Sequence, residues 1–224
     1  MNYSLIIPIY NEESTLPTLL KKLKELTNNI EIIIIDDGSD DNTNSILNKD
    51  KNFIHLRNKN NKGKGFAIKR GVEAANNEYI ILMDGDLEID FECIPRLINR
   101  FENNNYDVLV GIRWNKLSNY KYDINTLGNY FINGLFNIIY NTRLNDVLCC
   151  TKILNKNVIK SLDIQSNGFS IEIETMAKLI LNDFTIDQLH INYNRRSIED
   201  GKKLKLSDGW GIIGKMITIR LFNK

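Results

Sequence analysis

The sequence predicts an α/β protein built on a doubly wound, mostly parallel sheet. Short isoleucine-rich runs alternate with segments in which leucine recurs at helical spacing, and this alternation is typical of parallel sheets. The run from 30 to 35 is almost free of polar residues, as expected of a strand that helices cover on both faces. Polar clusters follow two of these runs directly, at 36–41 and 84–86, where ligands bind in such sheets.

The first half of the chain, 1–112, predicts five strands that alternate with helices. Apolar runs place the strands at 5–7, 30–35, 53–56, 79–83 and 108–110. Helical spacing and glycine-rich or capping residues place helices at 16–26, directly after 41, at 64–75 and at 94–101.

The second half, 113–224, has a looser pattern. We expect strands at 149–154 and 186–193 and helices at 127–140 and 171–181, the first of these helices being interrupted by two glycines. Because 224 residues suit one large domain, we expect residues 1–224 to form a single domain made of these two halves.

Composition excludes several classes of protein. With 42% hydrophobic and 25% charged residues the chain can bury a core, and a net charge of +1 argues against a nucleic-acid binder. Three cysteines without disulfide or metal-ligand spacing indicate a reducing cytoplasm. Because the sequence shows neither a signal peptide nor an apolar stretch of bilayer length, we expect a cytoplasmic protein that is at most peripheral on the cytoplasmic membrane face.

Asp84-Gly85-Asp86 is the first candidate for chemistry, because it follows a buried strand directly. Two carboxylates one residue apart on a turn suit Mg²⁺ or Mn²⁺, which take hard oxygen ligands and complete their shell with substrate phosphates and water. The glycine between them is expected to allow close approach of a diphosphate. By itself this tripeptide is equally compatible with an ordinary polar turn.

Further polar residues at strand ends predict a nucleotide site. Tyr10 offers an aromatic face to a base, Glu12 and Asp37 can accept from base or ribose groups, and Lys64 lies at the start of a helix, where phosphate is favoured. The chain has neither the G-x-G-x-x-G fingerprint after the first strand nor a G-K-[ST] loop. A dinucleotide-binding or P-loop protein is therefore disfavoured.

Several motifs taken together resemble those of family 2 inverting glycosyltransferases, which have the GT-A fold. The resemblance is closest to the dolichyl- or polyprenyl-phosphate sugar synthase branch and covers nearly the whole chain in order. The segments that carry it are Ser4-Leu-Ile-Ile-Pro-Ile-Tyr-Asn-Glu12, Ile35-Asp-Asp-Gly-Ser39, Asn61-Lys-Gly-Lys-Gly65, Met83-Asp-Gly-Asp86, Asp146-Val-Leu-Cys-Cys-Thr-Lys152, Gly168-Phe-Ser-Ile-Glu-Ile-Glu174, Tyr193-Asn-Arg195 and Glu199-Asp-Gly-Lys-Lys203.

The resemblance implies a hexosyltransferase-type enzyme that moves a sugar from a nucleoside-diphosphate sugar to an acceptor. The half 1–112 would then bind the nucleotide sugar and the half 113–224 the acceptor. Pro8, Tyr10, Glu12 and Asp37 would hold base and ribose, and Asp84 and Asp86 would surround the metal and the diphosphate. Arg113, Arg195 and Lys203 would contact the diphosphate or an acceptor phosphate, and Glu174 matches the acceptor-side acid of the family.

Two acceptor classes remain open at this point. A polyprenyl phosphate is already an anion and needs cationic guides, whereas a hydroxyl of a saccharide or another cell-envelope acceptor needs a general base. Glu174 is the first candidate for that base, and Glu172 is the second. Two remote alternatives remain. A sugar-nucleotide pyrophosphorylase would be expected to have a glycine-rich loop with arginine after the first strand, where this chain has Tyr10-Asn11-Glu12-Glu13. A non-catalytic nucleotide-binding protein is disfavoured by the intact Asp84-Gly85-Asp86 motif.

The C-terminal tail is both basic and apolar. From Arg195 to the end it holds eight basic and three acidic residues, a net charge of +5, and apolar residues crowd into its last fifteen positions. If helical, the tail is too short to span a bilayer but could lie on anionic lipid. The alternative is that this helix packs on the domain itself or on a second subunit, as in a homo-oligomer.

Overall fold

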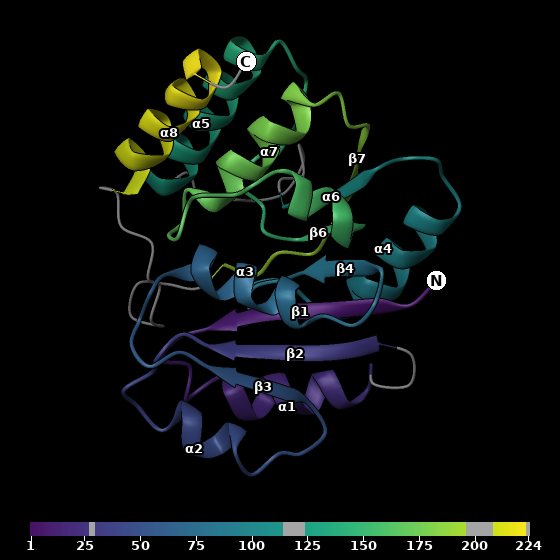
Figure 1. The fold of residues 1–224 in the computed structure, drawn as a ribbon, viewed down its shortest axis with the longest axis vertical. Coiled ribbons are helices and arrows are strands. Elements are labelled where there is room, and N and C mark those ends of the chain that lie inside the picture. The colour runs from purple at the N-terminus through teal and green to yellow at the C-terminus, as the bar shows by residue number, and fades with distance from the viewer. Residues whose placement is uncertain (27–29, 114–123, 196–207, 223–224) are drawn as a thin grey trace.

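The computed structural model describes residues 1–26, 30–113, 124–195 and 208–222 (Figure 1). In chain order its elements are β1 (Tyr3–Ile9), α1 (Leu16–Lys24), β2 (Ile30–Asp36), α2 (Thr43–Leu47), β3 (Ile54–Arg57), α3 (Lys64–Ala74), β4 (Tyr79–Leu82), α4 (Cys93–Glu102), β5 (Val108–Ile112), α5 (Ile124–Tyr140), β6 (Lys152–Asn155), α6 (Lys156–Ser161), α7 (Ile171–Leu181), β7 (Ile186–His190) and α8 (Asp208–Phe222).

The described strands form one seven-stranded sheet in the order β3-β2-β1-β4-β6-β5-β7. All neighbouring pairs are parallel except those of β6, which runs antiparallel to both β4 and β5. A mostly parallel sheet, as the sequence predicts, is confirmed. Because β6 is reversed, its first residue, Lys152, pairs with Leu82 and lies at the edge where β1, β2, β4, β5 and β7 end.

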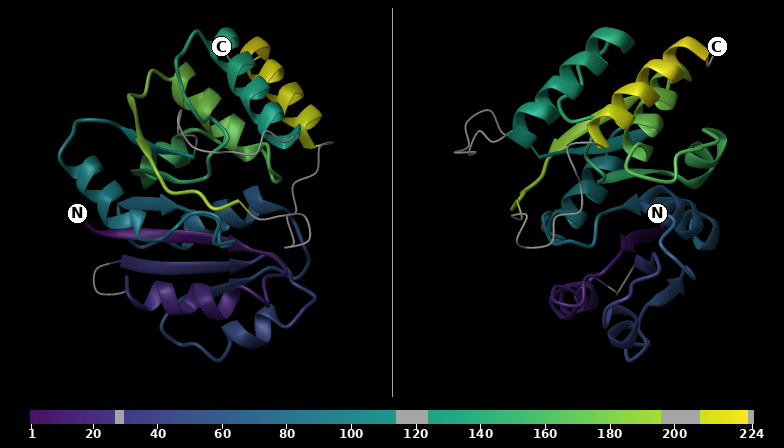
Figure 2. Two further views of the ribbon diagram at one scale, coloured as in Figure 1. Left: turned by 180° about the vertical axis from the view of Figure 1, so that it is seen from behind. Right: turned by 90° about the vertical axis from the view of Figure 1, so that its left-hand side faces the viewer.

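Helices cover both faces of the sheet, which makes it doubly wound. A Cβ on Gly71 of α3 would meet the side chains of Ile6 and Ile35, whereas one on Gly85 would meet Ile7, Ile9 and Leu19 of α1. Ile6 and Ile7 are consecutive in β1 and so point to opposite faces. Hence α3 and α1 lie on opposite sides, as the front and back views show (Figures 1 and 2).

Most element boundaries agree with the sequence to within a few residues, and two differences concern β6. The expected strand 149–154 begins only at Lys152, and α6 follows it directly, although the sequence pattern shows no helix there. The side chain of Asn155 caps α6 by accepting from the backbone N–H of Asn157 at 2.8 Å. Six residues contain too little periodicity for this helix to be recognised.

The C-terminal tail is helical, and its inner side packs on the domain. Ile212, Met216 and Ile219 of α8 are buried, and Tyr140 of α5 donates its hydroxyl hydrogen to the carbonyl of Met216 at 2.8 Å. Packing on the domain, one of the two expectations for the tail, is thus observed for this side of the helix. None of the helices in the described part of the chain is both long and apolar enough to cross a bilayer.

Candidate active site

The residues singled out from the sequence gather at the edge where the parallel strands end. Tyr10 follows β1, Asp37 follows β2, Asp84 follows β4, and Arg113 follows β5. The N-terminal ends of α3 and α7 add Lys64 and Glu172, which form an ion pair at 2.9 Å and therefore meet at this edge. Parallel topology thus brings together side chains that are far apart in the sequence.

Asp37 organises the loop that leads into α3. Its carboxylate accepts from the side chain of Asn58 at 2.6 Å and from the backbone N–H groups of Lys62 at 3.0 Å and Gly63 at 2.7 Å. Gly38 beside it has φ +77°, and a Cβ there would lie 2.4 Å from the backbone of Asn60. In the structure Asp37 therefore shapes the loop that holds the expected phosphate-side lysines.

The carboxylates of Asp84 and Asp86 lie in different environments. Lys64 places its ammonium 2.8 Å and 3.0 Å from the two oxygens of Asp84. Asp86 accepts only from the backbone N–H of Glu88, at 3.0 Å, among the described residues. Burial, followed by the neighbouring carboxylates of Asp84 and Glu88, raises the pKa of Asp86 to about 7. Within the described residues no cation forms an ion pair with this carboxylate, and the charge of Lys64 only partly offsets the rise in its pKa.

Lys64 belongs to a buried chain of charges that reaches α7. Glu172 pairs with Lys64 at 2.9 Å and with Lys152 at 2.6 Å, and Lys152 is also hydrogen-bonded to the carbonyl of Cys149. Although burial opposes ionisation, the two lysines lower the pKa of Glu172 to about 2. The sequence named Lys152 only as the end of a family-like segment, because nothing in the sequence alone shows that β6 is reversed.

The acidic turn Asp84-Gly85-Asp86 fits a divalent cation in donor type. Its two carboxylates lie close enough for the charge of Asp84 to raise the pKa of Asp86, and Lys64 contacts Asp84. Carboxylate oxygen is the donor that Mg²⁺ and Mn²⁺ prefer. In the described part of the chain no group of three or more candidate ligands occurs, so the described residues would fill only part of the coordination shell of such an ion.

Arg113 is held by a bidentate ion pair beside the acidic turn. Its Nε and Nη2 lie 2.8 Å and 2.9 Å from the carboxylate of Asp146, and its guanidinium lies over the ring of Tyr193, 5.5 Å from the centroid. The hydroxyl of Tyr193 donates to Glu88 at 2.9 Å. These contacts fix the segment after β7 against the residues that follow Asp86.

Glu174 is the residue whose surroundings differ most from its expected role as a base. Its side chain is 0% exposed, and it accepts from the backbone N–H groups of Gln165 and Ser166 at 3.0 Å and 2.7 Å. Ion pairs with Lys178 at 2.9 Å and Lys215 at 3.2 Å complete its shell. These bonds outweigh burial and lower the pKa of Glu174 to about 2, which is unfavourable for taking a proton near neutral pH.

The remaining predicted site residues occupy varied positions. Pro8 and Tyr10 are half-buried at the end of β1, whereas Glu12 is buried and accepts from the hydroxyl of Thr15 at 2.5 Å. Arg195 donates to the hydroxyl of Thr126 at 2.8 Å. Lys203 lies outside the described residues.

Gly85 is also required by packing. The side on which a Cβ would stand faces Ile7 and Ile9, with the nearest atom at 2.4 Å. The turn therefore packs closely on β1 and leaves no room for a side chain at this position, which is a reason separate from the expected approach of a diphosphate.

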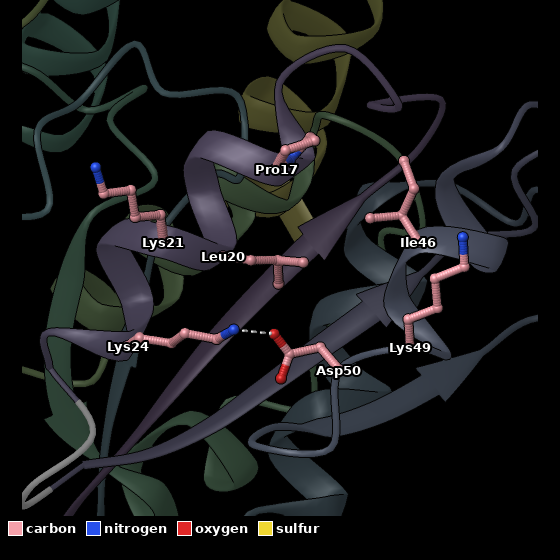
Figure 3. Close-up of a pocket in the computed structure, with 7 residues that line it drawn as sticks. All are labelled: Pro17, Leu20, Lys21, Lys24, Ile46, Lys49 and Asp50. Atoms are coloured by element: carbon pink, nitrogen blue, oxygen red, sulfur yellow. Dashed lines mark ion pairs between the residues drawn. The ribbon is translucent and has the colours of Figure 1, made fainter.

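A separate hollow lies between α1 and α2 and shares no residue with this cluster. It is lined by Pro17, Leu20, Lys21, Lys24, Ile46, Lys49 and Asp50, and the ammonium of Lys24 lies 2.8 Å from Asp50 (Figure 3). It lacks the converging carboxylates of the strand edge.

Comparison with known sequences identifies related proteins. The model of the family described as "Glycosyl transferase family 2" matches residues 4–162. An uncharacterised protein of Methanocaldococcus jannaschii is 32% identical over 179 residues, covering 75% of this chain and 77% of that protein. The undecaprenyl-phosphate 4-deoxy-4-formamido-L-arabinose transferase of Photorhabdus laumondii is 30% identical over 168 residues. That match covers 71% of this chain and 50% of the transferase, so the chain spans about half the length of that relative.

Comparison with solved structures shows the same fold. The Mycobacterium tuberculosis glucosyl-3-phosphoglycerate synthase, solved with Mn²⁺, uridine diphosphate and phosphoglyceric acid, superposes with a TM-score of 0.78 at 15% identity, over 99% of this chain and 78% of that one. Residues 1–349 of Staphylococcus aureus TarS, solved with UDP-GlcNAc, give a TM-score of 0.65 at 18% identity, over 100% and 67%. The fold is thus the GT-A fold. Since the family model covers most of the sequence, the chain belongs to glycosyl transferase family 2 and is a glycosyltransferase.

Proposed function

We propose that this enzyme transfers a sugar, with inversion, from a nucleoside-diphosphate sugar to a polyprenyl phosphate, and that the transfer depends on Mg²⁺ or Mn²⁺. The half 1–112 binds the donor and the half 113–224 presents the acceptor. An oxygen of the acceptor phosphate attacks the anomeric carbon from the face opposite the diphosphate. The bond from that carbon to the diphosphate breaks, and its electron pair leaves with the nucleoside diphosphate.

The observation that carries the acceptor class is the state of the two carboxylates on α7. Glu172 is paired with two lysines, Glu174 is held by two backbone N–H groups and two lysines, and both have a pKa of about 2. Neither suits the role of general base that a hydroxyl acceptor would need. A phosphate acceptor needs no base, and the relative from Photorhabdus laumondii is named for a polyprenyl-phosphate acceptor.

On the donor side, the leaving diphosphate needs positive charge. Asp84 and Asp86 would hold the divalent cation, which supplies electrostatic stabilisation of the leaving group. Lys64 is already within ion-pair distance of Asp84 and lies at the start of α3, so it is placed to contact the diphosphate as well. Arg113, Arg195 and Lys203 remain candidates for guiding the acceptor phosphate.

The test is a transfer assay with purified enzyme, Mn²⁺, a panel of UDP-, GDP- and CDP-sugars, and either a short-chain polyprenyl phosphate or the matching polyprenol. We expect sugar transfer to the phosphate alone, with release of the nucleoside diphosphate. Glu174→Gln should retain this transfer per folded molecule, whereas Asp86→Asn should lose it by a factor of roughly 100 or more, as electrostatic stabilisation of the leaving group is removed.

Two results would contradict the proposal. Transfer to the polyprenol, together with loss of turnover in Glu174→Gln at unchanged donor binding, would establish a hydroxyl acceptor with Glu174 as its base. Full activity of Asp86→Asn, or of the wild type in excess chelator, would contradict the metal role.

A further inference from the structure

The outer sides of α5 and α8 carry most of the large apolar side chains that face solvent. Of the ten such side chains in the described part of the chain, four lie on α5 (Leu127, Tyr130, Phe131 and Ile138). Another four lie on α8 (Trp210, Ile217, Leu221 and Phe222). We call these eight residues the α5–α8 face. Ile138 is 80% exposed and Trp210 is 79% exposed, so the domain leaves these two side chains almost uncovered.

Six of the eight residues of the face belong to a regular stripe on each helix, which a glycine completes. Leu127, Phe131, Gly134 and Ile138 occupy positions i, i+4, i+7 and i+11 of α5, and Trp210, Gly214, Ile217 and Leu221 have the same spacing in α8. Side chains at this spacing share one side of a helix. Nothing lies within 4 Å of the place where a Cβ on Gly134 or Gly214 would stand, so both stripes are open along their length.

Packing of the domain does not account for these stripes. The inner sides of the two helices are already buried, through Ile132 and Phe136 on α5 and through Ile212, Met216 and Ile219 on α8. A surface helix of a globular protein ordinarily turns charged residues outward. These two helices are apolar on both sides, which indicates that the outer side has a partner of its own.

Charge narrows the choice of partner. Residues 124–142 contain no Asp, Glu, Lys or Arg, and residues 209–222 contain two cations, Lys215 and Arg220, and no acid. Lys215 is paired with Glu174, whereas Arg220 is exposed, so a second copy joined through the same face would bring two Arg220 side chains together without a carboxylate from these helices. The expected partner has an apolar interior for the exposed side chains and negative charge at its surface for the cations. A lipid bilayer with anionic headgroups has this composition.

The face is also continuous with the candidate active site. The helices run side by side in both views of Figure 2, and α8 is tied to α7 through the ion pair of Lys215 with Glu174 at 3.2 Å. At the start of α5, Thr126 accepts from Arg195, one of the candidate acceptor residues. A surface that carries the acceptor would therefore lie beside the site.

We propose that the α5–α8 face seats the enzyme on an anionic lipid surface, so that a lipid-linked acceptor reaches the site from the bilayer. This proposal rests on the proposed function for its purpose, but it concerns a different part of the molecule. Because α8 also buries an inner side against the domain, removal of the tail would disturb the fold. Substitution of exposed residues is therefore the better test.

The experiment measures co-sedimentation with vesicles of phosphatidylcholine, with and without phosphatidylglycerol, in the absence of donor and acceptor. The variant combines Phe131→Ser, Ile138→Ser and Leu221→Ser, and the matched control is Ile54→Thr, an exposed apolar residue on β3. We expect wild type and control to pellet with phosphatidylglycerol vesicles at low salt, less so at high salt. The triple variant should bind roughly tenfold more weakly or worse, at an unchanged unfolding temperature.

The outcomes separate this proposal from its alternatives. Wild type that stays in the supernatant at every salt concentration, or a triple variant that binds like wild type, would overturn it. Sedimentation velocity that shows a dimer for wild type and a monomer for the triple variant, without vesicle binding, would identify the face as an interface between copies. Vesicle binding without sugar transfer to any polyprenyl phosphate would refute the proposed function and leave the lipid surface standing.

Discussion

At the scale of single residues, Lys64 connects the turn after β4 with the start of α7. Its ammonium bridges Asp84 at 2.8 Å and Glu172 at 2.9 Å, and these charges raise its pKa well above the usual value in spite of burial. It therefore stays protonated and occupies oxygens that a divalent cation would use. The lysine and the metal compete for Asp84, and Glu172 remains as a second partner for the lysine.

This competition predicts that Lys64→Met binds Mn²⁺ alone more tightly than the wild type. Removal of one positive charge beside the carboxylates strengthens their attraction for a cation, by a factor of roughly ten or more at an effective dielectric constant of about 20. Titration calorimetry with Mn²⁺ in the absence of nucleotide measures the effect. The matched control is Lys160→Met, which removes a surface lysine paired with Glu73. Equal or weaker Mn²⁺ binding by Lys64→Met would show that the lysine does not compete.

The sequence predicted the site residues that directly follow parallel strands. Asp37, Asp84 and Arg113 follow parallel strands, and parallel strands end at one edge, so their proximity followed from the pattern. The surroundings of Glu174 could not be inferred this way. Its shell comes from the backbone at 165 and 166 and from Lys215 on α8, contacts that tertiary packing alone determines.

At the scale of elements, local patterns predicted the strands and long helices but not the direction of β6. A buried strand shows a run of apolar residues whether it is parallel or antiparallel to its neighbours. The sequence of 152–155 therefore does not reveal that β6 is antiparallel to β4 and β5. That reversal is what brings Lys152 to Glu172. The structure of the loop 58–63 also depends on a particular backbone conformation, that of Gly38 at φ +77°.

Gly38→Ala is therefore predicted to disrupt the loop that leads into α3. The added Cβ would lie 2.4 Å from one backbone atom of Asn60 and 2.7 Å from the backbone nitrogen of Asn61, and backbone cannot rotate away as a side chain can. Because this clash adds to the strain of a positive φ, we expect the unfolding free energy to fall by about 2–4 kcal/mol and nucleotide binding to weaken. Urea unfolding and calorimetry with a nucleoside diphosphate measure the two effects. The control is Gly168→Ala, where a Cβ would have nothing within 4 Å. Matching stability of the two variants would contradict this account of the loop.

At the scale of the whole molecule, Glu174 links parts of the second half that are distant in sequence. From α7 its carboxylate contacts the backbone at 165 and 166 and pairs with Lys215 of α8, while the ion pair with Lys178 lies within α7 itself. This buried, ionised group is therefore one of the contacts that position the α5–α8 face, together with the buried side chains on the inner side of α8. Protonation of that group should loosen the contact between α8 and the rest of the molecule.

The pH dependence of stability tests this link. The pKa of Glu174 is about 2 in the folded chain against an ordinary value of 4.5, so the folded state binds this proton less readily than the unfolded state. The stabilisation is present above pH 4.5 and is lost as the pH falls toward 2, with a magnitude on the order of 3 kcal/mol. Urea unfolding of wild type should show this decline between about pH 6, where the stabilisation is complete, and about pH 3, where part of it is lost. In Glu174→Gln the decline should be smaller, from a lower starting stability, because the amide places a donor where two N–H groups need an acceptor. Glu73→Gln, a change at an exposed carboxylate, should follow the wild-type curve. If all three proteins show the same pH dependence, Glu174 does not provide the link between α7 and α8.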